Sequence, residues 1–491
     1  MVVLFSVTSV PTVQTFLAQK IANKFNKQYG TEVQINTAEL NLSGNIDLNN
    51  FLVIDHKSDT LIYFSSLNLS PRSLKKLISN DLNFNSIEFN GLQLNLIKYI
   101  SEDKTNLEIF LDKLNNQKKP VNIGTSLNFE IKNIIGFNSN ISFKDYNSFG
   151  NNFILSDLNI DFSNMKLFEN NLNFDINNIN YKNDLGFSLK EFSSNLIINK
   201  KDFYLNDIEF HYEKSILKGD LYIDFSKINN ENSINIAGLD SVYLDFKISD
   251  SKINPSDFSI IYDKIDKTYS DSWNLKSDIN GFISNLKINN TILSNNDNLI
   301  EFDAKLSNIF SGRDDYLLDF KFDKIKTSSQ TINSIFPEVF GTIIPTSTKS
   351  LGKFDFNGNA LINSYEVKSN FNLEIQEGNV NAFLKISDLS NIDNAIYTGY
   401  VEGKNLDISK FVNFKSIGNS NFKLDINGRG FTSKYLNSQV TGKIEEISFN
   451  NKIFQKLEIF GQVKDQVFDG KLTLNNPNFN LDFSGLIDFS N

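Results

Sequence analysis

Short runs in which apolar and polar residues strictly alternate recur along almost the whole chain, and they limit the fold more than any other feature. Successive side chains of a β-strand point to opposite faces, so each run predicts a strand with one apolar face and one polar face. Such runs are Leu92–Leu96, Leu127–Ile131, Leu158–Phe162, Leu172–Ile176 and Val242–Ile248. A chain made mostly of such strands must cover its apolar faces or leave them for something else to occupy.

The composition excludes several classes of protein. With 491 residues the chain exceeds the size at which single hydrophobic cores stop growing. Its 40% hydrophobic and 22% charged residues are typical of a folded protein. A net charge of −10 argues against nucleic acid as a partner, because phosphate-binding surfaces are basic. The absence of cysteine excludes disulfides and thiolate metal sites.

The N-terminus combines a short apolar segment with an amphipathic helix. The first ten residues are mostly apolar but are too few to cross a bilayer, which takes about 20 residues in a helix. After Pro11, apolar residues spaced by three and four predict a helix that ends at Tyr29-Gly30. This helix either closes one end of the β-structure or is the outer part of a membrane anchor whose beginning is missing, and we favour the anchor. The predicted anchor residues are Val2, Val3, Leu4, Phe5, Val7 and Val10.

Turn signals and short helices divide the rest of the chain. Asn-Gly pairs beside alternating runs predict tight hairpins, and they occur at Asn90-Gly91, Asn280-Gly281, Asn357-Gly358 and Asn427-Gly428. Short helices are expected within 70–78, 335–340 and 406–412. At ~12 residues for each strand and turn, the chain would hold roughly 35–40 strands. Open sheets of that size do not form globular sandwiches, so we predict a mainly β fold, an elongated, curled antiparallel sheet that forms a β-groove.

The predicted organisation has three parts. Residues 1–29 form the N-terminal amphipathic or anchor helix, and residues 30–335 form the β-groove. Residues 336–491 continue the groove with degenerate repeats of helix, strand and hairpin. The boundary lies in the helical, proline-containing stretch between Asn333 and Ser350.

Residues that could carry out catalysis are few. No phosphate-binding loop follows a predicted strand, and no zinc-protease motif is present. His56 lies between Asp55 and Asp59, which could suggest acid–base chemistry or a metal ligand. The same residues separate two apolar runs, and a polar hairpin turn is the favoured interpretation. His211 lies on the polar phase of a strand and is expected at the surface. We therefore predict no enzymatic activity, no cofactor and no metal site.

Several segments resemble the TamB family as it occurs in Bacteroidetes-type bacteria. One contains Phe51-Leu-Val-Ile-Asp55-His56 followed by Asp59-Thr-Leu-Ile-Tyr63, and another is Ile87-Glu-Phe-Asn-Gly-Leu92. Similar motifs continue at 397–408 and 470–485. The resemblance implies an AsmA-like β-groove of the bridge-type lipid transfer superfamily, anchored in the inner membrane with its bulk in the periplasm of the bacterial cell envelope. Members of the family are linked to phospholipid transport between the two membranes and to outer-membrane protein assembly.

The chain departs from the family pattern at both ends. The anchor lacks its first half and its basic flank, and the C-terminal region that would meet an outer-membrane barrel partner is missing. We therefore expect the sequence to be an N-terminal fragment of a longer protein.

Three functions fit these observations. The first is a lipid conduit, in which one apolar face solvates phospholipid acyl chains at ~0.8 kcal/mol per buried methylene. The second is a protein-assembly factor whose strand edges template nascent outer-membrane strands. The third is a structural surface protein or adhesin whose apolar faces pack on each other. For the conduit, the predicted lining residues are Leu92, Leu94, Leu96, Leu127, Phe129, Ile131, Leu158, Ile160, Phe162, Leu172, Phe174, Ile176, Val242, Leu244, Phe246 and Ile248.

Overall fold

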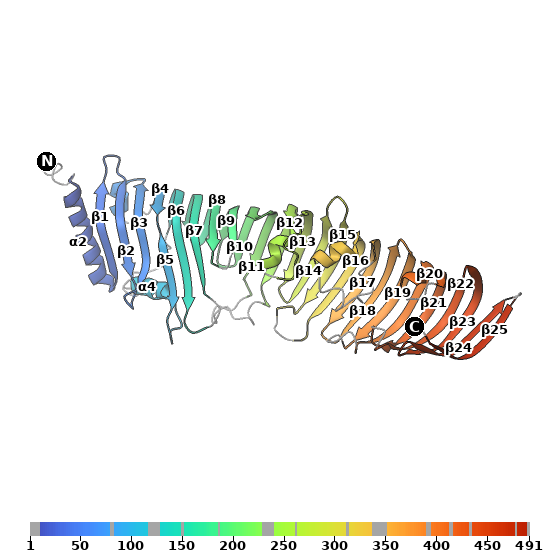
Figure 1. Ribbon diagram of the computed structural model, residues 1–491. Coiled ribbons are helices and arrows are strands. Elements are labelled where there is room, and N and C mark those ends of the chain that lie inside the picture. Colours follow the sequence, from blue (N-terminus) through green and yellow to red (C-terminus); the bar gives the residue numbers. More distant parts are fainter. Residues whose placement is uncertain are drawn as a thin grey trace. The chain divides into compact units, whose positions relative to one another are not determined.

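The chain is mainly β, as predicted, with an N-terminal helix and a few short inserted helices. The computed structural model (Figure 1) describes residues 10–78, 83–115, 128–148, 152–184, 187–227, 240–260, 263–310, 314–335, 351–388, 394–411, 416–431, 435–476 and 479–488. These residues contain 25 strands. The sequence predicted more strands than these residues contain, because the observed strands are longer than expected and reach 17 residues.

Two compact units divide the chain, Met1–Ser226 and Lys227–Asn491, here called unit 1 and unit 2. The boundary predicted after residue 335 lies inside unit 2 and adjoins residues 336–350, which are outside the described residues. That boundary stays a prediction.

Unit 1 is a sheet in which strands that follow one another in sequence mostly pair antiparallel. The exceptions are β4 and β5, which both lie between β3 and β6 and pair in parallel with β6. The elements are α2 (Pro11–Tyr29), β1 (Glu32–Leu40), β2 (Ile46–Ile54), β3 (Thr60–Pro71), α3 (Leu74–Ile78), β4 (Phe84–Asn90), β5 (Gln93–Lys98), α4 (Asn106–Asn115), β6 (Phe129–Asp145), β7 (Phe153–Phe168), β8 (Asn171–Asn183), β9 (Ser188–Ile198), β10 (Asp202–Tyr212) and β11 (Ser215–Asp224).

Unit 2 is a sheet in which every described strand pairs antiparallel with the next one in sequence. Its elements are β12 (Tyr243–Ile253), η1 (Pro255–Ile260), β13 (Trp273–Phe282), β14 (Asn285–Ser294), β15 (Leu299–Ser307), β16 (Leu317–Ser328), α6 (Ser329–Ile335), β17 (Lys353–Asn363), β18 (Glu366–Ile375), β19 (Gly378–Ser387), β20 (Ile396–Asp407), η3 (Ile408–Lys410), β21 (Ile417–Arg429), β22 (Asn437–Phe449), β23 (Lys452–Lys464), β24 (Val467–Asn476) and β25 (Phe479–Asp488).

Helix α2 lies along the free edge of β1 (Figure 1) and bonds to its backbone. The Thr15 hydroxyl donates to the carbonyl of Ala38 at 3.1 Å and accepts from its N–H at 3.0 Å. Asn26 makes the same pair of bonds with Val33, at 2.8 and 2.7 Å. Gln14 does so with Leu40. These side chains satisfy edge groups that would otherwise be open to pairing with another strand.

The predicted end of this helix is confirmed. Gly30 has the left-handed conformation (φ 63°) and its N–H bonds to Asn26 O at 2.8 Å, which is a common way for a helix to end. The hydrogen bonds from α2 to β1 show that this helix covers one edge of the β-structure, which is one of the two roles considered for it. Of the predicted anchor residues, only Val10 is described, as the exposed residue that precedes the helix. Val2, Val3, Leu4, Phe5 and Val7 lie outside the described residues.

The Asn-Gly pairs do not form the predicted hairpins. Asn90-Gly91 joins β4 to β5, and the other three pairs lie inside β13, β17 and β21. Gly281 and Gly358 adopt φ values of 129° and 154°, which residues with a side chain rarely take. A methyl group at Gly358 would also collide with the carbonyl oxygen of Asn370 on β18. These glycines therefore serve close strand contact, and tight turns are made by Asn450-Asn451 and Asp465-Gln466, whose φ values are all positive.

Four β-bulges share one construction. Asn138, Asp207, Asn290 and Asn405 have φ between 48° and 54° inside strands, at positions where the register shifts. The backbone N–H of each donates to an Asn or Asp side chain on the next strand, at 2.6–3.0 Å. Those acceptors are Asn159, Asp220, Asp303 and Asn421. Bulges bend a strand and increase its twist, so this device curves the sheets at fixed places.

Replacing Thr15 by Val and Asn26 by Leu should expose the edge of β1. We expect increased, concentration-dependent self-association, because four bonds that occupy edge groups are removed. Sedimentation velocity and thioflavin fluorescence measure it. The matched control replaces Thr12 by Val and Asn23 by Leu, two exposed positions of the same helix. Equal association of both double variants would disprove the edge-protection role.

Asp303→Ala should destabilise unit 2, because the N–H of Asn290 loses its acceptor at the bulge. The expected loss is about 1 kcal/mol, a typical net value for one hydrogen bond. Asp303→Asn keeps an acceptor oxygen and should stay close to wild type. Thermal unfolding followed by circular dichroism compares the two, and equal midpoints for the Ala and Asn variants would contradict the role of this bond.

Candidate functional site

In unit 2, the apolar residues of each strand lie opposite apolar residues or glycines of the next strand at most positions, from β12 to β25. Phe246 pairs with Ile279, and Ile279 pairs with Ile288 on the following strand. At the other end, Leu472 of β24 pairs with Phe483 of β25. Because cross-strand partners lie on the same side of a sheet, the apolar residues of all these strands share one face. We call it the apolar face of unit 2.

Five phenylalanines form a connected cluster on this face, across β15 to β18. Their ring centroids are 5.5–6.2 Å apart, within the range of favourable aromatic contacts. None of the five rings is fully buried. The phenylalanine cluster consists of Phe302, Phe320, Phe322, Phe356 and Phe371.

The opposite face of unit 2 carries charged residues that pair across strands. Lys385 lies 2.9 Å from Glu366, and Lys471 lies 3.3 Å from Asp482. Hydrogen bonds from Lys368 and Lys385 hold the pKa of Glu366 below its usual value. Glu366 is partly buried, whereas Lys471 and Asp482 are exposed, so the Lys471–Asp482 pair contributes little stability but keeps this face hydrated. This face is mainly polar, although exposed apolar residues such as Phe383 and Phe460 also lie on it.

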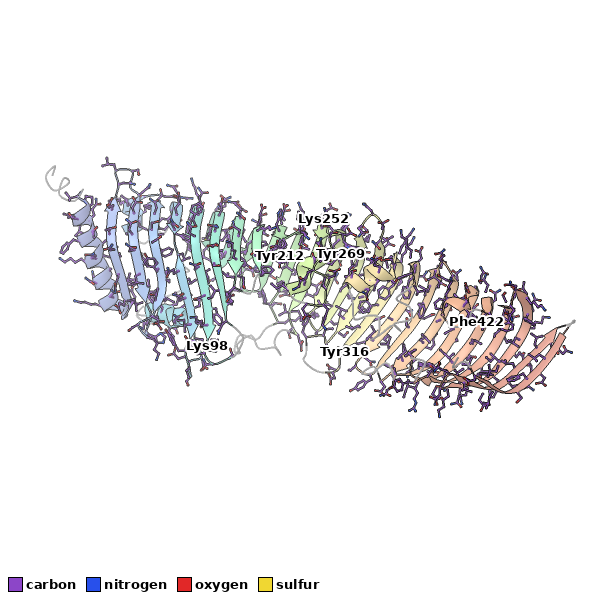
Figure 2. The ribbon with its side chains drawn as sticks, in the orientation of Figure 1. Lys98, Tyr212, Lys252, Tyr269, Tyr316 and Phe422 are labelled. Atoms are coloured by element: carbon purple, nitrogen blue, oxygen red, sulfur yellow. The ribbon has the colours of Figure 1, made fainter. Side chains whose placement is uncertain are left out.

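Glycines on the apolar faces make room for aromatic rings. A methyl group at Gly403 of β20 would collide with the ring of Phe422 on β21 (labelled in Figure 2). In the same way, the ring of Phe89 on β4 occupies the space above Gly136 on β6. An aromatic ring lying over a glycine on the next strand helps to fix the register of a sheet.

Apolar side chains of the strands remain open to water in both units. Most apolar residues of the strands are only partly buried. Within the described residues, the apolar faces are therefore not covered by a complete second layer.

In unit 1 the apolar residues are packed more tightly. Phe174, Ile176 and Leu196 are buried to 9% exposure or less and form the centre of a cluster. Phe162 and Leu172 pack against them, and the rings of Phe162 and Phe174 lie 5.1 Å apart. Neighbouring strands β7 to β10 contribute to this cluster, which we call the unit 1 cluster.

The structure brings together four of the residues predicted to line a groove, namely Phe162, Leu172, Phe174 and Ile176, all in the unit 1 cluster. Leu94 and Leu96 of β5 pair with Ile141 and Phe143 of β6. The other described predictions lie near or within strands of the two units, and they are Leu92, Phe129, Ile131, Leu158, Ile160, Val242, Leu244, Phe246 and Ile248. Leu127 lies outside the described residues.

The phenylalanine cluster was not among the predicted lining residues. Its signal is present in the sequence as the alternating pair Phe320 and Phe322, and as Phe356, which alternates with Phe354 outside the cluster. The same alternation that singled out the earlier runs could have found it.

The predicted polar turn at Asp55 to Asp59 is confirmed, and Asp55 is its centre. One oxygen of Asp55 accepts from the N–H groups of Lys57 and Asp59, at 2.8 and 3.0 Å. The other oxygen accepts from Tyr99 at 2.8 Å and from Asn106 at 2.9 Å. Burial alone would raise the pKa of Asp55, but these four hydrogen bonds outweigh it and lower the pKa. The carboxylate thus joins the β2–β3 turn to the start of α4.

A polar cavity of about 240 Å³ lies beside this turn, between α4 and the start of β1. His56 borders it, and its Nε2 is 3.0 Å from Glu102 while its Nδ1 is buried without a hydrogen-bond partner. The bond with His56 lowers the pKa of Glu102. His211 is partly exposed and lies 3.0 Å from Glu209 on the same strand. Neither histidine is joined by a nucleophile in these contacts.

Neither a membrane-spanning helix nor a metal site occurs among the described residues. No helix in that part of the chain combines the length and apolarity that a bilayer crossing requires. The same residues contain no group of three or more His, Asp or Glu side chains placed to hold a metal ion. Membrane anchoring through residues before Val10 stays a prediction.

Comparison with known proteins gives no relative for this fold. No family model, curated protein or solved structure matches the chain. The resemblance to TamB proteins stays a prediction that depends on the motifs at 51–63, 87–92, 397–408 and 470–485.

Asp55→Asn should lower thermal stability at pH 7, because its amide N–H₂ would face the donor groups of Tyr99 and Asn106. A hydrogen bond to a charged group contributes about 1.5–3 kcal/mol. Tyr99 and Asn106 keep second acceptors in Asp59 and the Asn95 carbonyl, so we expect a loss at the lower end of this range. Since the pKa of Asp55 is lower in the folded chain, its stabilisation is present above the unfolded pKa, about 3.9, and is lost as pH falls through the folded value.

The test follows thermal midpoints from pH 7 to pH 3 for wild type, Asp55→Asn and the exposed control Asp323→Asn. The difference between wild type and Asp55→Asn should shrink at the acid end, and the control should follow wild type throughout. A constant difference at every pH would show that ionised Asp55 is not the source of the stability.

Proposed function

We propose that the chain is a lipid-binding conduit protein, whose apolar faces carry phospholipid acyl chains. The observation that carries the proposal is the apolar face of unit 2, in register across β12 to β25 and only partly covered. An exposed apolar area of this extent is unfavourable in water unless a ligand or partner covers it.

Acyl chains suit such a surface because they need no specific polar contact. Each methylene that leaves water contributes ~0.8 kcal/mol, so a tail of 16 carbons would gain on the order of 10 kcal/mol if fully covered. A row of half-buried phenylalanines offers contact area along a line, which matches an extended tail. The charged opposite face would remain in water.

The resemblance to TamB proteins extends this proposal to a setting. It implies an inner-membrane anchor before the β-structure, the periplasm around it, and an outer-membrane partner reached through a further C-terminal region. Phospholipid movement between the two membranes is the activity that fits both the resemblance and the apolar face.

The two other functions have weaker support. A factor that templates strands needs a free strand edge. At the β1 end of unit 1, α2 occupies that edge through Gln14, Thr15 and Asn26. A structural β-protein would bury its apolar faces against each other, but the phenylalanine cluster is only partly buried. Both observations favour the lipid conduit.

Phe322→Asp should strongly reduce the phospholipid that co-purifies with the full chain, because a carboxylate in the middle of the phenylalanine cluster repels acyl chains. Lipid extracted from the purified protein is quantified by mass spectrometry. The transfer of labelled phospholipid between vesicles is measured in parallel, and both should fall at least fivefold.

Asn359→Asp is the matched control, since it adds the same charge to the polar phase of the neighbouring strand β17. It should bind and transfer lipid as the wild type does. Circular dichroism checks that both variants fold. Unchanged lipid content in a folded Phe322→Asp protein, or no lipid in the wild type, would rule out the conduit for this part of the chain.

A further inference from the structure

Helix α2 presents its polar side to the sheet and its apolar side to solvent. The side chains that bond to β1 are Gln14, Thr15, Gln19 and Asn26, and the one buried apolar residue of the helix is the small Ala22. Surface helices of globular proteins normally do the reverse and bury their large apolar residues. The orientation of α2 therefore leaves an apolar stripe that the fold itself does not use.

This stripe contains large side chains that are well exposed. Phe16 is 59%, Leu17 is 44% and Ile21 is 70% exposed. Successive residues of a helix are about 100° apart, so these three side chains lie on one half of its circumference. Nearby, the β1–β2 turn beside the first helical turn exposes Leu42 almost completely. Apolar residues thus concentrate at the end of unit 1 that α2 forms.

Lysines lie on the same side of the helix. Lys20, Lys24 and Lys27 are all exposed, and Lys20 lies 5.4 Å from the ring centre of Phe16. The helix contains no Asp or Glu, although the chain as a whole has a net charge of −10. Positive charge and exposed large apolar side chains therefore lie on the same face of α2.

We propose that the outward face of α2 docks in the headgroup region of a membrane that contains anionic phospholipid. Phe16, Leu17 and Ile21 would enter the boundary between headgroups and acyl chains, and the three lysines would meet lipid phosphates. Amphipathic helices with lysine beside bulky apolar residues bind membrane interfaces in this way, lying in the plane of the surface. Among partners, an anionic bilayer is favoured because both its charge and its apolar boundary complement this face.

The inference stands apart from the lipid conduit. It concerns attachment of unit 1 to a surface and needs no lipid on the apolar face of unit 2. It also differs from a membrane-crossing anchor, since the docked residues belong to a helix that remains bonded to β1. If both hold, the docked helix would place the first strand of unit 1 beside the lipid surface.

The test uses the purified full chain and vesicles of phosphatidylglycerol and phosphatidylcholine in equal amounts, with pure phosphatidylcholine vesicles for comparison. Flotation measures the bound fraction over a range of lipid concentrations. Wild type should bind the anionic vesicles at least tenfold more tightly than the neutral ones, and salt should weaken binding.

Two sets of variants separate charge from apolar contact. Changing Lys20, Lys24 and Lys27 to Gln should weaken binding to anionic vesicles roughly a hundredfold, since each lysine near such a surface is worth about fivefold. Leu17→Gln with Ile21→Gln should weaken binding to the anionic vesicles at least tenfold. The matched charge control changes Lys252, Lys305 and Lys326 to Gln, which are exposed lysines of unit 2, and should bind as wild type does.

The outcomes distinguish the two proposals. Phe322→Asp should still float with anionic vesicles, and the α2 variants should keep their co-purified lipid. Circular dichroism and an unchanged sedimentation coefficient exclude misfolding as the cause of any loss. Vesicle binding that is unaffected by the α2 variants, or reduced equally by the unit 2 lysine control, would overturn docking through α2.

Discussion

The arrangement of the strands in each unit depends on one constraint: the apolar residues of successive strands must stay on the same face. Because side chains alternate with a period of two, a slip of one residue in any pair would move that strand's apolar residues to the polar face. The bulges preserve the phase where the sequence interrupts it. In β14 the apolar-phase positions run Leu286, Ile288, then Thr291, and their partners on β15 run without a break as Leu306, Ala304, Phe302. The extra residue is absorbed by Asn290, which takes a left-handed conformation and is held by Asp303.

The same rule appears in several strands and explains part of the asparagine and aspartate content. In β10, Leu205 and Ile208 pair with Leu221 and Gly219, with Asp207 as the extra residue. Asn and Asp tolerate the left-handed conformation better than other residues with side chains, and their short side chains also serve as acceptors on the next strand. Polar residues at these positions therefore have a structural role, although from composition alone they would be taken for solvent-facing residues.

The features that depend on the spacing of apolar residues along the chain could be predicted from the sequence. The features that depend on contacts with neighbouring strands could not. Alternation identified the strands and their phase, and spacing together with Gly30 located α2 and its end. Asn-Gly was misread as a turn, because the reason for glycine at Gly358 is the close carbonyl of Asn370 on another strand, which no local pattern reveals. The side of α2 that faces the sheet was equally hidden, since it is set by bonds from Thr15 and Asn26 to backbone groups. The turn at Asp55 was predictable, but its link to Asn106 on α4 was not.

A uniform apolar face and a defined pocket lead to different kinds of recognition. A pocket selects a ligand by shape and by a few fixed polar contacts, whereas a continuous face selects by contact area and by the absence of charge. The rings of Phe302, Phe322 and Phe356 offer area but, within this cluster, no hydrogen-bonding group. An acyl chain bound there, as proposed, would gain a similar free energy beside each of these rings, so it could shift from one strand to the next without meeting a deep minimum. Tight binding at one point would oppose movement of the ligand. A face that carries similar apolar side chains on each strand offers no such point. The same register that keeps the fold intact thus produces a surface on which binding and displacement are compatible.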